Sequence, residues 1–392
     1  MNLTNIDAAQ LAWPRIARRV RAAGMLVALA LLSGCAWFGW GNDKKAAALP
    51  VITGSNAASL VWSASVGKTG GYLFTPAFGD RLVYAVSRDG GIHALSEEGG
   101  RVVTRLDAKT PLTGGIGFGE NTVVVGSGKG DVIALDSAGR ALWKSAIAGE
   151  VLAAPVVASG NVIVRTADGR IFALNRIDGK RNWVFQRAAP ALTLRTSASV
   201  IVNRGVIYAG YPGGKVVALE LDSGKPIWES AISLPRGSTE LERIADVSGL
   251  PVLDDTRICA AVYQGRTGCV ETLNGNVLWS REISSADGVA IDAKQVYVAD
   301  TAGNVFALDK TNGATVWKLE KLQLRDPGTP VVVKGKIVVG DKDGLVHVMS
   351  PENGDLIGRV ATDGSRVVSL LAGSDRVIAQ TDKGGVFAIT VK

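Results

Sequence analysis

Histidine is the first side chain to test for chemistry, because imidazole binds transition metals and also acts as a general base near neutral pH. The chain of 392 residues has only two, His93 and His347, and each stands three residues after a glycine that opens the same repeated motif. Equivalent positions in distant repeats do not make a metal pair, and neither histidine lies in a motif that would organise a nucleophile. We therefore expect core packing at both, with no metal site and no catalytic residue.

A second set of polar side chains begins the hairpin turn after a repeated apolar strand. These residues are Asp136, Asn175, Asp222 and Asp309. Asp and Asn stabilise turns by accepting hydrogen bonds from nearby backbone amides. Their recurrence in four copies predicts a structural role, since a catalytic role would single out one copy.

Two cysteines near the centre of the chain are candidates for a disulfide. Cys259 and Cys269 fall on neighbouring strands of one predicted hairpin, whose turn lies near residues 264–265. An oxidising compartment would favour the bond. Simple pairing about that turn, however, places Cys269 opposite Ala260 rather than Cys259, so a bridge would need a bulge or distorted geometry. The sequence leaves both alternatives open, a disulfide or two small buried thiols.

The elements that position all these side chains are eight copies of one motif. It opens with Gly, runs as an apolar strand to Ala-Leu five residues on in its best copies, and reaches a turn Gly. Four residues after that Gly stands a Trp in five copies, whereas Thr104 and Gly358 hold this Trp position in the first and seventh copies. The residues at the Leu position are Leu95, Leu135, Leu174, Leu219, Val270, Leu308, Met349 and Ile389, spaced by 40, 39, 45, 51, 38, 41 and 40 residues. A period near 40 made of short apolar strands, with Gly, Asp and Asn between them, predicts one four-stranded propeller blade per copy.

The two ends of the repeat array predict how the ring closes. Ile389 is followed by only three residues, so the eighth blade has no fourth strand of its own. The segment LVWSASV around Trp62 is such a strand without a blade before it. We expect this strand to complete the last blade, which removes an open sheet edge. The predicted fold is all-β: an eight-bladed β-propeller of four-stranded antiparallel blades over residues 59–392, closed by the N-terminal strand.

Residues 1–34 have the features of an export signal. Arginines between Arg15 and Arg21 precede an apolar run at residues 25–32, which is too short for a bilayer-spanning helix of about 20 residues. The LSGC that follows resembles the bacterial lipobox, which implies lipidation of Cys35. Ala36 stands where inner-membrane lipoproteins have Asp, which implies the outer membrane. Residues 35–58 would be a lipidated tether, and its aromatic side chains belong either to a membrane interface or to a disordered linker.

Charge gives little support for a nucleic-acid partner. The formal charge of the whole chain is +7, and the predicted signal contains four Arg and one Asp, so +4 remains after its removal. This mild excess is spread along the chain without a Lys/Arg block.

The repeat resembles the quinoprotein-type repeat, best seen in VVALELDSGKPIW at residues 216–228 and VFALDKTNGATVW at residues 305–317. In that superfamily the Trp packs between blades, so the motif indicates a fold and not an enzyme. The quinone-dependent dehydrogenases add two adjacent cysteines and Ca²⁺ ligands, and this sequence has no adjacent cysteine pair. A periplasmic dehydrogenase-like propeller is the alternative reading, and we expect no cofactor.

The lipobox, the eight repeats and two insertions together resemble the BamB family of the bacterial β-barrel assembly machinery over nearly the full length. The insertions follow Trp183 and Trp228 and connect the last strand of one blade to the first strand of the next. They therefore emerge on one rim of the ring, where propellers commonly carry recognition. The resemblance implies a non-enzymatic scaffold, lipid-anchored at the outer membrane and facing the periplasm. It would bind BamA and assist insertion of β-barrel proteins, with unfolded outer-membrane proteins as further clients.

In that family the surface for BamA includes a Leu-x-Leu-Arg segment and an Asp-x-Asp segment from the two loops. Leu192, Leu194 and Arg195 match the first segment; Asp246 matches the first Asp of the second, and Ser248 replaces its second Asp. The leucines suit an interface anchor or else tuck under their own loop, and the sequence does not decide between these. We expect Asp246 to be a solvated rim charge that contributes little to binding.

Overall fold

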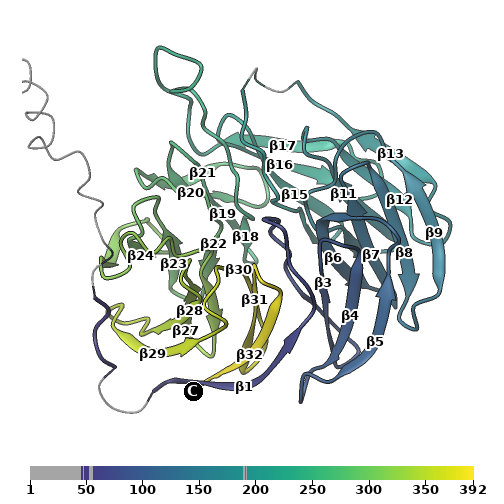
Figure 1. Ribbon diagram of the computed structural model, residues 1–392. Coiled ribbons are helices and arrows are strands. Elements are labelled where there is room, and N and C mark those ends of the chain that lie inside the picture. Colours follow the sequence, from purple (N-terminus) through teal and green to yellow (C-terminus); the bar gives the residue numbers. More distant parts are fainter. Residues whose placement is uncertain (1–45, 47, 53–55, 189, 191) are drawn as a thin grey trace, which may run out of the picture. The chain divides into compact units, whose positions relative to one another are not determined.

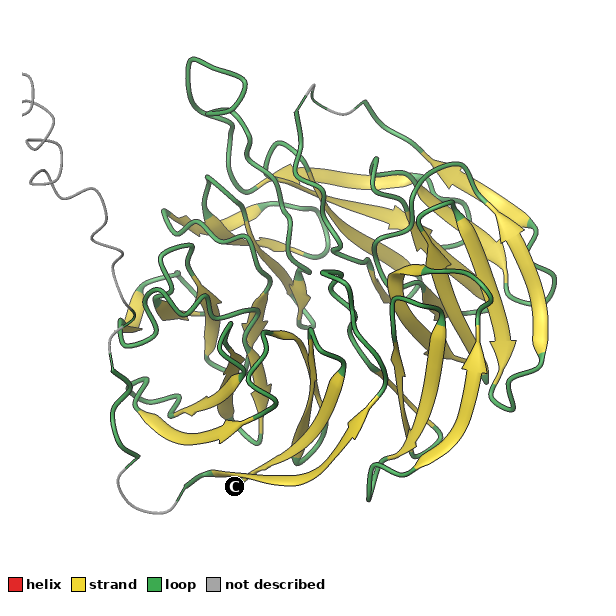
Figure 2. Ribbon diagram, viewed as in Figure 1, coloured by secondary structure: helices red, strands yellow, loops and turns green. Residues whose placement is uncertain are grey.

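Strands and loops make up the whole described part of the chain, without a helix (Figure 2). The computed structural model describes residues 46, 48–52, 56–188, 190 and 192–392. The predicted signal peptide, the predicted lipidation site Cys35 and the first residues of the predicted tether lie outside the described residues. Within the described part, no helix long and apolar enough to span a membrane occurs.

Eight antiparallel four-stranded sheets form the blades of a β-propeller, as the repeats predict (Figure 1). Blades one to four contain β2 (Ala77–Gly79), β3 (Leu82–Val86), β4 (Gly91–Ser96), β5 (Val102–Asp107); β6 (Leu112–Gly119), β7 (Thr122–Ser127), β8 (Asp131–Asp136), β9 (Ala141–Ala146); β10 (Val156–Ala158), β11 (Asn161–Arg165), β12 (Ile171–Asn175), β13 (Arg181–Phe185); and β14 (Ile201–Asn203), β15 (Val206–Tyr211), β16 (Lys215–Glu220), β17 (Pro226–Ala231). Blades five to eight contain β18 (Val252–Leu253), β19 (Arg257–Ala261), β20 (Thr267–Glu271), β21 (Val277–Arg281); β22 (Val289–Ile291), β23 (Gln295–Ala299), β24 (Val305–Asp309), β25 (Thr315–Leu319); β26 (Val331–Val333), β27 (Lys336–Gly340), β28 (Leu345–Met349), β29 (Leu356–Ala361); and β30 (Val367–Ala372), β31 (Arg376–Thr381), β32 (Gly385–Val391), β1 (Ala58–Ser65).

The core lies in layers between neighbouring blades. Successive side chains of a strand point to opposite faces of its sheet, and here both faces are covered. Val123 and Val125 pack toward blade one, whereas Val124 between them packs toward blade three. This arrangement explains why the inner strands are apolar at every position instead of alternating. The layer between blades eight and one contains Trp62, Val66, Val83, Ala85, Leu95, Ile378, Val386 and Ala388.

The N-terminal strand closes the ring. β1 pairs antiparallel with β32, from Ala58 opposite Val391 to Ser65 opposite Gly385. The N–H of Lys392 also donates to the carbonyl of Ala57 at 2.9 Å. The predicted closure is therefore confirmed, and the sheet edge that blade eight would otherwise expose is covered.

A tryptophan from one blade clamps the next blade at six junctions. Trp279 is typical: its indole Nε1–H donates to the carbonyl of Lys310 at 2.9 Å. Its ring lies so close to the turn glycine Gly313 that an added Cβ there would approach ring atoms to 2.5 Å. The repeated Trp of one blade and the repeated turn Gly of the next blade therefore contact each other across the junction. The six clamping residues are Trp62, Trp143, Trp183, Trp228, Trp279 and Trp317.

Gly358 stands in the tryptophan slot of blade seven for a steric reason. The chain entering β1 occupies the space beside it, and an added Cβ would lie 3.0 Å from both the Ala58 nitrogen and the Asn56 Oδ1. Asn56 pins this entry, because its Nδ2 donates to the Arg359 carbonyl at 2.9 Å and its Oδ1 accepts from the Arg359 N–H at 3.0 Å. A tryptophan at this junction would displace the closing strand.

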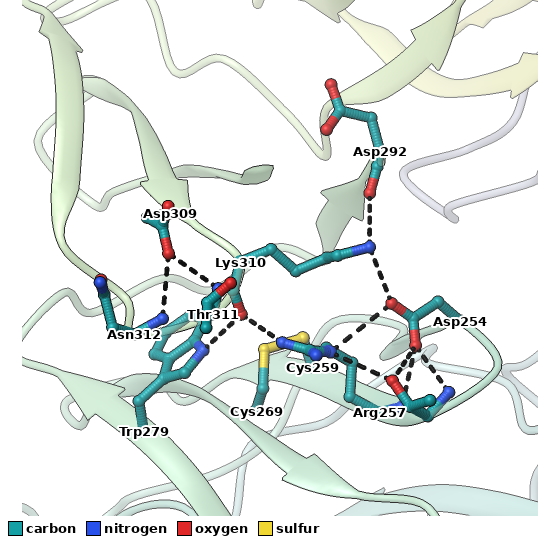
Figure 3. The surroundings of a disulfide bond; sticks show 11 residues. Asp254, Arg257, Cys259, Cys269, Trp279, Asp292, Asp309, Lys310, Thr311 and Asn312 are labelled. Atoms are coloured by element: carbon teal, nitrogen blue, oxygen red, sulfur yellow. Dashed lines mark hydrogen bonds and ion pairs between the residues drawn. A yellow bond between two sulfur atoms is a disulfide. The ribbon is translucent and has the colours of Figure 1, made fainter. Parts of the chain in front are cut away.

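A disulfide joins Cys259 on β19 to Cys269 on β20 (Figure 3). The two residues are directly opposite each other, with their Cα atoms 4.0 Å apart. The expected pairing of Cys269 with Ala260 is wrong, because the turn has three residues rather than two between its closing pair. That pair is Val262 and Arg266, whose N–H and carbonyl are 3.1 Å apart. One extra turn residue shifts the register by one, which brings the cysteines together without a bulge.

Ion pairs and hydrogen bonds link blades five and six beside this disulfide (Figure 3). Lys310 Nζ lies 3.1 Å from the Asp254 carboxylate, and Arg257 donates to the Lys310 carbonyl. The same carbonyl accepts the indole N–H of Trp279. The network therefore adds polar contacts to the tryptophan clamp at this junction.

Candidate functional site

Two long loops project from the same side of the propeller (Figure 1). The first, residues 186–200, joins β13 to β14, and the second, residues 232–251, joins β17 to β18. We call these the rim loops. They are tied together, since Leu194 N–H donates to the Asp246 carboxylate at 2.6 Å and the Thr196 hydroxyl donates to the Ser248 carbonyl at 2.6 Å. The loops outside the repeat thus form one surface.

Asp246 is the buried centre of this surface and not a solvated charge, so that expectation is wrong. Only 3% of the residue is exposed. Its backbone forms bridges with Pro212 and Tyr263, and its carboxylate accepts the Leu194 N–H. Burial raises the pKa of Asp246, and hydrogen bonds from the Leu194 and Gly213 backbones oppose that rise. The geometry makes Asp246 a residue that positions the first rim loop.

The matched Leu-x-Leu-Arg segment is only partly exposed. Leu192 is 44% exposed, whereas Leu194 is half-buried at the loop junction. Arg195 is exposed and pairs with Glu150 of the loop after blade two, at 2.5 Å between Nη2 and Oε1. Its guanidinium also lies over the ring of Tyr72, 5.7 Å from the centroid. The three side chains therefore reach solvent to different degrees, with Leu192 the most available apolar group.

Sequence reasoning missed further leucines on the second rim loop. Leu234 and Leu241 are 69% and 68% exposed, and Leu250 near the end of the loop is also exposed. Large exposed apolar side chains on projecting loops suit contact with another protein. For Leu241 a signal was present in the sequence, because it stands among charged residues in TELER at residues 239–243.

Ser248 belongs to the inner wall of the ring. Its hydroxyl donates to the Ala286 carbonyl at 2.7 Å, and it lines a central cavity of about 480 Å³. Asp287 is the only charged residue that lines this cavity among the described residues. Burial, followed by the negative charge of Asp326, raises the pKa of Asp287 to about 6. Ser248 therefore lies between the rim loops and the central cavity, and it supplies no second carboxylate to the rim.

The two histidines lie in different environments and in blades that are not neighbours, His93 in blade one and His347 in blade seven. His347 is fully buried, with Nε2 2.9 Å from the Asp341 carboxylate. Burial lowers the pKa of His347, while Asp341 opposes that shift, and burial also lowers the pKa of the half-buried His93. The described part of the chain contains no group of three or more His, Cys, Asp or Glu side chains arranged to hold a metal ion.

Comparison with known proteins gives consistent matches. The family model described as outer membrane protein assembly factor BamB matches residues 88–319. A relative of that name from Nitrosomonas eutropha is 40% identical over 334 residues, which cover 85% of this chain and 82% of the relative. The crystal structure of BamB from Moraxella catarrhalis matches with a TM-score of 0.79 and 28% identity, covering 85% of this chain and 99% of that one. Quinohemoprotein alcohol dehydrogenase from Comamonas testosteroni matches with a TM-score of 0.69 and 16% identity, covering 86% and 77%.

The closed ring and its clamped repeats define an eight-bladed β-propeller, and the likeness to the dehydrogenase extends to the fold alone. Outside the repeated strands, its two long loops form the rim. The chain belongs to the BamB family of outer membrane protein assembly factors.

Proposed function

We propose that the protein is a non-catalytic scaffold of the outer-membrane β-barrel assembly machinery, which binds BamA through the rim loops and assists insertion of β-barrel proteins. Unfolded outer-membrane proteins are further proposed clients. Family membership supports the assembly role.

One observation carries the proposal: the rim exposes leucines on a surface held in shape from beneath. Leu192 comes from the first rim loop, and Leu234 and Leu241 come from the second. The buried Asp246 fixes the two loops relative to each other through the Leu194 N–H. Apolar anchors on a preorganised surface bind better than the same side chains on loops that must order on binding.

The scaffold would be held at the periplasmic face of the outer membrane by lipid on Cys35, after removal of residues 1–34. Two acyl signals or more give stable anchoring without a spanning helix. Cys35→Ala should therefore yield a folded protein that stays unprocessed or is released from membranes. Fractionation with mass measurement of the N-terminus tests this, and unchanged attachment and processing would contradict it.

The partner surface is tested with the triple variant Leu192→Ala, Leu194→Ala and Arg195→Ala. Loss of a central anchor commonly costs about 2 kcal/mol, so we expect roughly a 30-fold weaker capture of BamA. Circular dichroism should be unchanged, because these residues lie outside the strands. Lys336→Ala, at the hairpin between β26 and β27 of blade seven, is the control and should bind normally. If the folded triple variant captures BamA as strongly as wild type does, these rim residues do not bind BamA.

The dehydrogenase-like alternative draws on fold likeness only. The two described cysteines pair across a hairpin and are not adjacent in the chain, unlike the cysteine pair of the quinone-dependent enzymes. Purified protein incubated with pyrroloquinoline quinone and Ca²⁺ should show no retained quinone absorbance after gel filtration. Stoichiometric retention would favour the enzyme.

A further inference from the structure

Arg165, at the end of β11, is a buried guanidinium without a carboxylate partner among the described residues. Only 3% of it is exposed. Its Nη1 donates to the Ala198 carbonyl at 3.2 Å and its Nη2 to the Gly210 carbonyl at 2.5 Å, while Nε has no partner. The ring of Tyr211 lies 5.0 Å from the guanidinium carbon. A guanidinium stays charged in proteins, so a full positive charge is balanced here only by carbonyl dipoles and an aromatic face.

This charge lines a cavity of about 380 Å³ between blades three and four. Tyr211 forms part of the wall, and Arg187 also lies over its ring, 5.0 Å from the centroid. Thr193 and Leu194 of the first rim loop line the cavity as well. The buried guanidinium is therefore reached from the surface that we propose for the partner.

The charged groups around the cavity do not balance. Arg187 and Lys215 share one acid, Glu229, at 3.0 and 2.5 Å. Asp168 pairs with Arg170 at 2.5 Å. Of the four charged residues that line the cavity, Arg165, Arg187 and Lys215 are bases and Asp168 is an acid. The nearby Asp246 carboxylate is already bonded to the Leu194 and Gly213 backbones. An unpaired buried charge is costly, because hydration is lost and no opposite charge replaces it.

We propose that the cavity takes up a carboxylate of the partner polypeptide, an Asp or Glu side chain that pairs with Arg165 when BamA lies on the rim. This inference rests on the proposed function of that rim. Pro190, Leu194 and Pro212 also line the cavity, and these apolar walls suit the methylene stem of an acidic side chain better than a hydrated inorganic anion. A charge-assisted bond to a planar guanidinium would fix the register of the partner.

The first test replaces the charge. Arg165→Met should lower the affinity for BamA at least tenfold, measured by surface plasmon resonance with full-length proteins. The affinity of Arg165→Lys should be intermediate, because an ammonium lacks the forked donors of a guanidinium. Arg281→Met is the control, since Arg281 is an exposed arginine that also donates to two backbone carbonyls but lies outside the cavity. The control should bind within twofold of wild type. Wild-type affinity of a folded Arg165→Met protein would overturn the proposal.

A second variant keeps the proposal testable if Arg165→Met does not fold. Thr193→Glu places a carboxylate on the loop that lines the cavity, with Thr193→Gln as the uncharged control. The Glu variant should melt at a higher temperature than the Gln variant and bind BamA more weakly, because its own carboxylate competes for the site. Equal melting temperature and equal affinity of the two variants would contradict a carboxylate site.

Two further outcomes separate this inference from the proposed function. If the triple rim variant loses BamA while Arg165→Met and Thr193→Glu bind like wild type, the carboxylate site is wrong and the rim stands. If the triple variant also binds normally, both fall. Acetate and inorganic phosphate serve as free-anion probes at matched ionic strength: protection of wild type from melting, combined with unchanged BamA affinity of Arg165→Met, would mean a small-anion site and overturn the partner assignment.

Discussion

The ring of blades and the rim loops are held together in different ways. Each blade junction repeats the same apolar layer, and six of them add a tryptophan clamp. The rim depends on a few unrepeated polar contacts, chiefly the Asp246 carboxylate under Leu194 and the Thr196 hydroxyl on the Ser248 carbonyl. Damage to the ring should therefore appear as lost stability, and damage to the rim as lost binding with the fold intact.

Removing the closing strand should have the largest effect. Deletion of residues 60–66 exposes the edge of β32 and opens the layer between blades eight and one. We expect aggregation or loss of cooperative unfolding. Size-exclusion chromatography would detect the first outcome and calorimetry the second. A monomeric deletion protein with wild-type melting would show that the ring does not need this strand.

Removing one clamp should weaken the ring without opening it. Trp279→Ala deletes a side chain that is 6% exposed and bonded to the Lys310 carbonyl, so we expect a loss of about 3–5 kcal/mol in the free energy of unfolding. Thr104 occupies the tryptophan position of blade one, and the junction between blades one and two has no tryptophan clamp, so Thr104→Ala should cost only about 0.5 kcal/mol. Urea denaturation measures both losses in the free energy of unfolding. Equal losses would show that the tryptophan clamp does not stabilise the ring more than the residue at an unclamped junction.

Breaking the rim tie should separate binding from global stability. Asp246→Ala leaves the Leu194 N–H without its acceptor, a local cost of about 1–3 kcal/mol. Hydrogen exchange at Leu194 should accelerate and BamA affinity should fall severalfold, with little change in global melting. Asp246→Asn keeps an acceptor oxygen and should restore most of both. If the Asn variant is as weak as the Ala variant, the carboxylate acts as a direct contact instead.

The smallest effect concerns the channel and depends on pH. The pKa of Asp287 is raised from 3.8 to about 6, so the folded protein binds its proton more tightly than the unfolded chain does. Stability from this group is full below pH 3.8 and is lost as pH rises toward 6. Asp287→Asn should therefore raise the melting temperature at pH 7.5 and have little effect near pH 4. A stabilisation by Asp287→Asn that is the same at both pH values would show that it does not come from the ionisation of Asp287.

The sequence predicted the blades because every copy has the opening Gly and an apolar anchor five residues later, and five copies add the Trp. It failed by one residue at the cysteine hairpin, where the turn beginning after Val262 has three residues and no side chain reports that length. It could not explain Gly358, because the reason is a chain segment 300 residues away in sequence.

The rim was harder to predict for a related reason. Its loops do not repeat, so no second copy indicated that Asp246 turns inward or that Leu234 and Leu241 turn outward. Arg165 looked like an ordinary strand residue, and its missing counter-charge is visible only when every neighbouring group is placed. Burial and charge balance are properties of the assembled fold, not of local pattern.

The pairing of β1 with β32 also sets the order of events in the life of the chain. Synthesis proceeds from the N-terminus, so β1 appears first and its partner appears last. During that interval the first strand has both edges unpaired, a condition that favours association with other extended chains. If Cys35 is lipidated as proposed, the waiting strand is also the one nearest the lipid. The final step of folding would then join a strand that is tethered to the membrane to the last strand made.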